Sequence, residues 1–200
     1  VIPFIRVMDS LTLAISQGSL RRGSAAVYLP INHPEIEEFI EIRRPTGGDP
    51  NRKAPNLHHG VLLSDAFMRA VENDEMWDLR FPDVYSDQYR QFDGTLEEAE
   101  KAGVPIRVYR TVSARDLFDK IIRQAHHNGE PGLLFLDAAN RSNPVSHLYA
   151  LEATNPCGEQ WLGPYENCCL GSINLAQHTL EGGGVDWGAL KESAELATRF

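Results

Sequence analysis

The chain has 200 residues, of which 42% are hydrophobic and 24% are charged, values that fit a soluble globular protein with a sizeable core. Its formal net charge of -9 does not indicate a surface that binds nucleic acid or an anionic membrane. Apolar runs are too short to cross a bilayer, and the first residues do not resemble a signal peptide, so we expect a cytoplasmic protein. Three cysteines do not indicate a secreted disulfide scaffold.

Both ends of the sequence suggest a stretch of a longer chain. The sequence begins without a methionine, and the first one is Met8. Residues 187–200 place apolar side chains at helical spacing, and no cap or polar tail follows them. We therefore expect residues 1–200 to form one partial domain that is truncated at both ends.

Apolar spacing, caps and turn residues divide the chain into alternating helices and strands. In chain order, the sequence predicts a helix at 4–16, a strand at 24–29, a helix at 34–42, an exposed loop at 43–56, a strand at 57–63, a helix at 65–73, a polar irregular stretch at 78–103 with a helical piece at 96–102, an extended piece at 104–109, a helix at 114–127, a strand at 133–136, mostly loop at 137–160, a strand at 170–175 and a helix at 187–200. Ser64 and Ser113 are the expected caps of the helices that follow them. This order predicts an α/β fold with a largely parallel sheet.

Asn155-Pro156-Cys157-Gly158-Glu159 combines three side chains that can carry chemistry. The proline and the glycine prevent regular helix or strand at this point. In an extended loop alternate residues point to one side, which would place the amide, the thiol and the carboxylate together. Such a trio can bind hydroxyl groups, move a proton and perform thiol chemistry. The alternative from the residues alone is a buried structural cysteine in a turn.

The adjacent pair His58-His59 lies in a predicted strand. Neighbouring strand residues point to opposite faces, so the two rings are not expected to ligate one metal ion. No cysteine or carboxylate stands nearby at metal-ligand spacing. We expect the pair to be structural or to line an active site, and we predict no metal site.

The motif at 155–159 and several others, in the same order along the chain, resemble the large catalytic subunit of ribonucleotide reductases. The segments that carry the resemblance are residues 21–23, 33–40, 56–59, 65–68, 77–79, 129–132, 137, 140–141, 153–160, 168 and 171–176. The Asn-Pro-Cys-Gly-Glu form is most typical of the adenosylcobalamin-dependent class II enzymes. The resemblance covers nearly the whole chain and is weakest over 79–110. It implies part of a ten-stranded α/β barrel, with residues 153–160 as its central finger loop.

The resemblance also implies a role for each residue of the motif. Cys157 would form a thiyl radical that takes the 3′-hydrogen of a ribonucleotide. Glu159, in a partly buried site, would accept the 3′-hydroxyl proton, and Asn155 would hold the ribose hydroxyls. Cys168 would be one member of the reducing pair, whose other member lies upstream of this chain. Cys169 departs from the family, which commonly has asparagine there, and we expect a small buried thiol.

Residues 17–23 resemble the specificity loop, which links an allosteric nucleotide to the substrate base. The residues that carry this resemblance are Gln17, Gly18, Arg21, Arg22 and Gly23. The glycines permit more than one loop conformation, and the arginines and the glutamine can bind a base. From the residues alone, an ordinary helix-to-strand turn with solvated arginines is the alternative.

The implied function is the reduction of ribonucleotides to 2′-deoxyribonucleotides for DNA synthesis. The implied cofactor is adenosylcobalamin, and the implied reductant is a dithiol renewed by thioredoxin or glutaredoxin. Deoxynucleotides and ATP would be effectors, and the full-length enzyme could be a homodimer, whereas the isolated chain would be inactive. The alternatives are a class I catalytic subunit with a separate metal-containing subunit as radical source, a hydrolase or transferase with Cys157 as nucleophile, and a non-catalytic nucleotide-binding fragment.

Overall fold

The computed structural model describes residues 1–16, 18 and 22–199. They form two compact units, residues 1–165 and residues 166–200, and each is considered by itself. None of the helices in the described part of the chain is both long enough and apolar enough to span a membrane.

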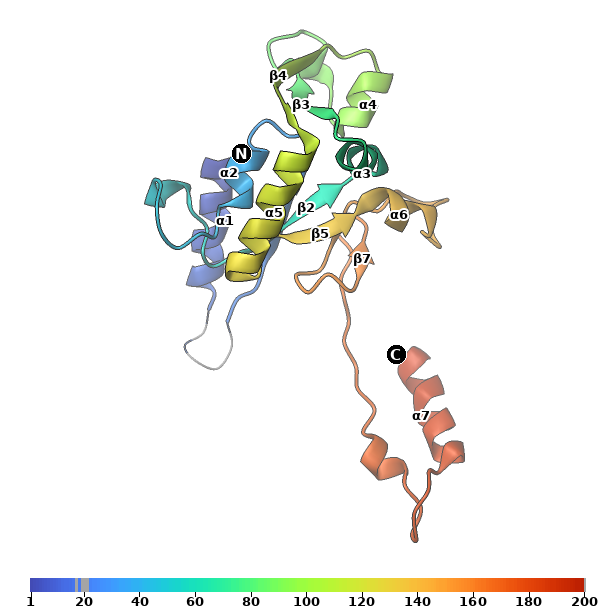
Figure 1. Cartoon of the computed structure of the whole chain (residues 1–200). Helices are drawn as coiled ribbons and strands as arrows, with labels where there is room; N and C mark the ends of the chain where they lie inside the picture. Colours follow the sequence, from blue (N-terminus) through green and yellow to red (C-terminus); the bar gives the residue numbers. More distant parts are fainter. Residues whose placement is uncertain (17, 19–21, 200) are drawn as a thin grey trace. The chain divides into compact units, whose positions relative to one another are not determined.

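A three-stranded parallel sheet lies at the centre of the first unit (Figure 1). Its strands are β1 (Ala26–Pro30), β2 (His58–Leu63) and β5 (Gly132–Phe135), in the order β1-β2-β5. The sequence predicted all three strands, since each is a short apolar run bounded by turn residues. The predicted parallel sheet within an α/β fold is confirmed, although these three strands do not close a barrel.

Four helices bury their apolar faces in the core of the first unit, which is built mainly of isoleucine, leucine and phenylalanine. They are α1 (Ile2–Ala14), α2 (Ile36–Ile40), α3 (Asp65–Glu72) and α5 (Ala114–Asn128). Ser64 and Ser113 cap α3 and α5 as predicted, each accepting a backbone N–H with its side-chain oxygen. Helix α2 is shorter than the predicted 34–42, because residues 33–35 form a turn in which His33 Nδ1 accepts the Glu35 N–H.

An antiparallel hairpin of β3 (Met76–Pro82) and β4 (Ile106–Ser113) flanks the stretch 78–103 that the sequence left irregular. Strand β3 enters the start of that stretch, and β4 overlaps the extended piece predicted at 104–109. Between its strands lie the short 3₁₀ helix η2 (Tyr89–Gln91) and helix α4 (Leu96–Lys101). Strand β3 was missed because polar and charged residues interrupt its apolar pattern. Its pairing with β4 stabilises it as a strand despite this weak local pattern.

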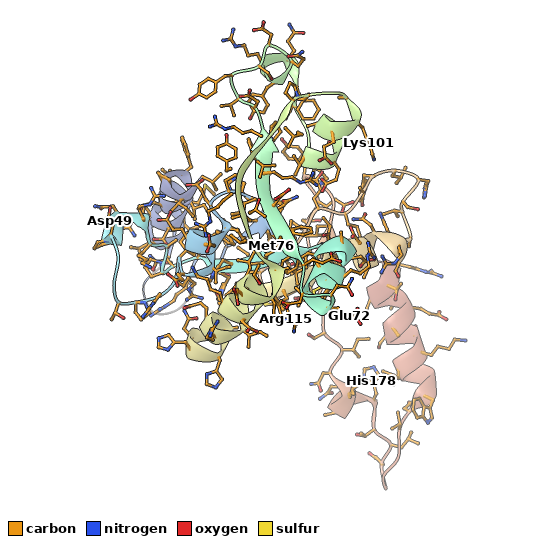
Figure 2. The ribbon with its side chains drawn as sticks, turned by 45° about the horizontal axis from the view of Figure 1, so that its top comes forward. Asp49, Glu72, Met76, Lys101, Arg115 and His178 are labelled. Carbon is orange, nitrogen blue, oxygen red and sulfur yellow. The ribbon has the colours of Figure 1, made fainter. Side chains whose placement is uncertain are left out.

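The base of this hairpin is fastened to the helices on either side. Arg115, in the first turn of α5, donates to the Glu72 carbonyl at the end of α3 (3.3 Å) and to the Asp74 carboxylate (3.1 Å). Figure 2 shows Glu72, Met76 and Arg115 close together at this junction.

The remaining elements are short. They are the 3₁₀ helix η1 (Pro50–Arg52), helix α6 (Leu136–Arg141), strands β6 (Ala153–Thr154) and β7 (Trp161–Leu162), and, in the second unit, η3 (Leu175–His178) and helix α7 (Trp187–Arg199). The predicted strand at 170–175 is wrong: residues 170–174 have no regular structure, and the exposed Leu170 has no sheet to pack against within the described second unit. Helix α7 confirms the predicted helical pattern at 187–200 for its described residues.

Candidate functional site

The Asn-Pro-Cys-Gly-Glu motif forms a tight turn between two paired strands. Strands β6 and β7 are antiparallel and support the finger loop, residues 153–160. The Gly158 N–H donates to the Asn155 carbonyl oxygen (3.0 Å), and Gly158 has a φ of +85°. Pro156 and Cys157 are therefore the two central residues of a β-turn, and the next residue, Gly158, is the one with the positive φ. The expectation of an extended loop is wrong, because the same proline and glycine that exclude regular structure favour this turn.

Asn155 helps to build the loop as well as to present a polar group. Its backbone N–H donates to the Gln160 carbonyl, and its side-chain Oδ1 accepts the Gln160 N–H, both at 3.1 Å. Its Nδ2 amino group has no hydrogen-bond partner among the described residues. One end of this amide thus orders the loop, and the other end is free to donate to a ligand.

Cys157 and Glu159 are exposed at the tip of the loop. Neither side chain has a polar partner within the described part of the chain. The expected partial burial of Glu159 is wrong within the described part of the chain. The loop tip extends from the short β6–β7 pair, and no core packs over it. The thiol is likewise not a structural cysteine buried in a core.

Cys168 and Cys169 belong to the second unit, and both are free and exposed. The expectation that Cys169 is a small buried thiol is wrong, because this segment has no regular structure and no core around it. Cys157 belongs to the first unit and Cys168 to the second, and the role of Cys168 as a member of the reducing pair stays a prediction.

The base of the finger loop is held by a residue that sequence reasoning missed. The Tyr28 hydroxyl, on β1, lies 2.8 Å from Thr154 Oγ1 and 2.9 Å from the Asn155 carbonyl oxygen. Thr154 Oγ1 also lies 2.9 Å from that carbonyl oxygen. No spacing in the sequence could reveal this contact, because Tyr28 and Thr154 are 126 positions apart.

The segment that resembles the specificity loop is described only in part. Gln17 and Arg21 lie outside the described residues. Gly18 has a φ of +57°, and Arg22 is exposed. The roles of these residues and of Gly23 stay predictions.

The two ends of that segment are tied together. The Gly23 N–H donates to Ser16 Oγ, which in turn donates to the Thr12 carbonyl, both at 3.0 Å. A Cβ atom on Gly23 would stand 2.6 Å from the Thr12 carbonyl oxygen. The segment therefore leaves α1 and returns to it in close backbone contact.

A second polar cluster, which we call the carboxylate cluster, consists of Arg43, His58, His59 and Glu130. Arg43 Nη1 and His58 Nδ1 lie 2.5 and 2.6 Å from Glu130 Oε1. The backbone N–H and Nδ1 of His59 lie 3.2 and 3.0 Å from Oε2. Although the histidines are neighbours on a strand, each reaches a different oxygen of one carboxylate, which strand alternation alone did not suggest.

The carboxylate cluster joins the start of β2 to the turn before β5. Burial opposes the ionisation of Glu130, but hydrogen bonds from His59, Arg43 and His58 outweigh it and hold the pKa of this carboxyl well below its usual range. Among the described residues, no group of three or more histidines, cysteines and carboxylates is arranged to hold a metal ion. The contacts of His58 and His59 with Glu130 agree with the structural role, one of the two roles that the sequence predicted for this pair.

Comparison with known proteins defines the class to which this fold and this loop belong. The family model for the barrel domain of ribonucleotide reductase matches residues 1–200. The chain belongs to the ribonucleotide reductase family.

Particular relatives agree with this assignment. A vitamin B12-dependent ribonucleoside-diphosphate reductase of Mycobacterium tuberculosis is 38% identical over 100% of this chain and 25% of its own length. A reductase of the same name from Thermoplasma acidophilum is 36% identical over 100% of the chain and 23% of its length. The ribonucleoside-diphosphate reductase subunit alpha of Chlamydia muridarum is 32% identical, over 100% and 20%. The chain therefore spans about a quarter or less of the length of these relatives.

Proposed function

We propose that this chain supplies the radical-bearing finger loop of an enzyme that reduces ribonucleotides to 2′-deoxyribonucleotides. One observation carries the proposal: a structured turn presents the Cys157 thiol, the Asn155 amino group and the Glu159 carboxylate, all without partners among the described residues. Folding has not used these groups, so they are available to a ligand. The names of the relatives favour a ribonucleoside diphosphate as substrate.

The chemistry follows from the three groups and a dithiol. Cys157 loses the hydrogen atom of its thiol to a radical source, and the resulting thiyl takes the 3′-hydrogen of the ribose. Glu159 accepts the 3′-hydroxyl proton, while the Asn155 amino group holds a ribose hydroxyl. The 2′-hydroxyl leaves as water, and a dithiol that includes Cys168 supplies two electrons and two protons and becomes a disulfide. Glu159 returns its proton to the 3′-oxygen, and Cys157 returns a hydrogen atom to the 3′-carbon and is again a thiyl.

The radical source is proposed to be adenosylcobalamin, in line with the names of the vitamin B12-dependent relatives. When bound, this cofactor supplies an organic radical, and the exposed Cys157 thiol is open to such a reactant. A class I arrangement, with a separate metal-containing subunit, is the second candidate, because the chlamydial relative is named a subunit alpha.

We propose the reductant and the effectors on the basis of the family resemblance. Thioredoxin or glutaredoxin would renew the dithiol, and deoxynucleotides or ATP would act through residues 17–23. The hydrogen bond between Ser16 and Gly23 supports a loop whose two ends are held together beside α1. The full-length enzyme is proposed to form a homodimer.

The test is deoxyribonucleotide formation by a complete reductase polypeptide that carries these 200 residues, supplied with a dithiol and with adenosylcobalamin but no second subunit. We expect turnover, and we expect Cys157→Ser to lower it by about 10³-fold or more, because the serine O–H bond does not yield its hydrogen atom. Turnover only with an added metal-containing subunit would favour the class I arrangement. Retention of activity by Cys157→Ser would contradict the proposed function.

A further inference from the structure

The finger loop is anchored to the parallel sheet by a triangle of three oxygen atoms. Tyr28 Oη, Thr154 Oγ1 and the Asn155 carbonyl oxygen lie within 2.8 to 2.9 Å of one another. The two hydroxyl groups bring two protons to three contacts. Either both hydroxyls donate to the carbonyl oxygen, or one donates to the carbonyl oxygen and the other donates to its neighbouring hydroxyl, so the carbonyl always accepts from at least one of them.

The sheet makes room for this anchor through a missing side chain. Gly60, on the central strand β2, is the register partner of Tyr28 on β1. A Cβ atom on Gly60 would lie 2.9 Å from two carbon atoms of the Tyr28 ring and 2.8 Å from Leu134 Cδ1. Since the φ of Gly60 is not positive, its lack of a side chain serves this close approach and not an unusual backbone conformation.

The carbonyl that Tyr28 reaches is also the acceptor of the turn itself. The Gly158 N–H donates to the same Asn155 oxygen (3.0 Å), and Cys157 lies within that turn. Thr154, the other member of the triangle, is buried. A change in the position of the Asn155 carbonyl would therefore tilt the turn that carries the thiol.

We propose that Tyr28 is a positioning residue for the radical cysteine, acting with Thr154 through the Asn155 carbonyl and seated over Gly60. It does not touch substrate in this role; it sets where the Cys157 turn stands above the sheet. The inference rests on the proposed function for its catalytic consequence, whereas the anchoring itself stands on the geometry alone.

The first arm of the test measures amide hydrogen exchange in the 200-residue chain. Tyr28→Phe removes one hydroxyl, and we expect the Gly158 and Gln160 amides to exchange about fivefold faster. Tyr28→Phe with Thr154→Val removes both side-chain donors to the carbonyl, so the increase should exceed the product of the two single effects. Gly60→Ala keeps both hydroxyls but displaces the ring, and it should resemble Tyr28→Phe. Tyr109→Phe, on β4, is the matched control and should leave these amides unchanged.

The second arm measures turnover in a complete reductase polypeptide that carries the chain. We expect Tyr28→Phe to lower kcat about tenfold while KM for the nucleotide stays within twofold, because a displaced thiol weakens the chemical step and not binding. Thr154→Ser, which keeps the hydroxyl, should retain most activity, and Thr154→Val should not.

The two arms separate the two ways to fail. Exchange rates in Tyr28→Phe that match those of Tyr109→Phe would overturn the anchor. Faster exchange with an unchanged kcat, in an enzyme that Cys157→Ser inactivates, would overturn the positioning role. If the Cys157→Ser enzyme were as active as the parent while exchange still rose, the proposed function would fail and the anchor would stand.

Discussion

The carboxylate cluster and the finger loop both gather polar groups at the edge of secondary structure, but they use them in opposite ways. In the cluster, Glu130 is 17% exposed and both of its oxygens have partners. In the loop, Cys157 and Glu159 are exposed and have no polar partner within the described residues. The first arrangement stabilises the fold, and the second leaves a thiol and a carboxylate free to react with or bind a ligand. We therefore expect changes at the two places to separate stability from activity.

Truncation of Glu130 should have the largest effect on folding. Glu130→Ala leaves Arg43 and His59 without their shared acceptor, and His59 has a fully buried side chain. We expect the free energy of unfolding to fall by about 3 kcal/mol, at the lower end for a broken buried pair because Glu130 is partly exposed. Urea unfolding at pH 7 measures this. Glu159→Ala, the same change in the finger loop, is the control and should shift the value by less than about 0.5 kcal/mol.

Gly23→Ala tests the tie at the specificity-like loop and should come second. The added methyl group would stand 2.6 Å from the Thr12 carbonyl oxygen, which is backbone and cannot move without α1. We expect a loss of about 2 kcal/mol in urea unfolding. Gly171→Ala meets nothing within 4 Å and has no positive φ, so equal losses in the two variants would contradict this account.

Acid should weaken the carboxylate cluster in a predictable window. The folded-state pKa of Glu130 lies below its usual range. Its contribution is therefore fully present above the unfolded-state pKa of about 4.3 and is lost as the pH falls further below it. Between pH 5 and pH 3 the unfolded chain takes up a proton at this carboxyl while the folded chain keeps it ionised, so we expect the free energy of unfolding to fall by about 1.5 kcal/mol. Glu130→Gln should lack this part of the pH dependence. If the free energy of unfolding fell equally with pH in the two proteins, Glu130 would not be the group responsible.

Local signals in the sequence were sufficient for much of the first unit. Strands β1, β2 and β5 are short apolar runs, and Ser64 and Ser113 cap their helices through contacts three residues away. Long-range partners were not predictable. Strand β3 depends on pairing with β4, and a strand at 170–175 was expected from a local pattern that finds no neighbouring strand within the described second unit.

In the candidate site, too, local features were predictable from the sequence and long-range contacts were not. The sequence identified the residue types at 155, 157 and 159, because the chemistry of an amide, a thiol and a carboxylate does not depend on the fold. It did not predict the turn that holds them or the Tyr28 anchor. The parallel register places Tyr28 across from Gly60, and the Tyr28 hydroxyl contacts a residue 126 positions away; neither relation can be read from a local pattern.

The smallest effect on folding is expected where the effect on chemistry is greatest. Cys157→Ser replaces one small exposed group by another, and it breaks no disulfide and no side-chain hydrogen bond to a described residue. The free energy of unfolding should change by less than about 0.5 kcal/mol in urea. A loss of activity in the complete enzyme would then reflect the missing thiol alone. A loss of 2 kcal/mol or more would instead mean that the thiol stabilises the turn, and the contrast between a structural cluster and a chemically free loop would have to be abandoned.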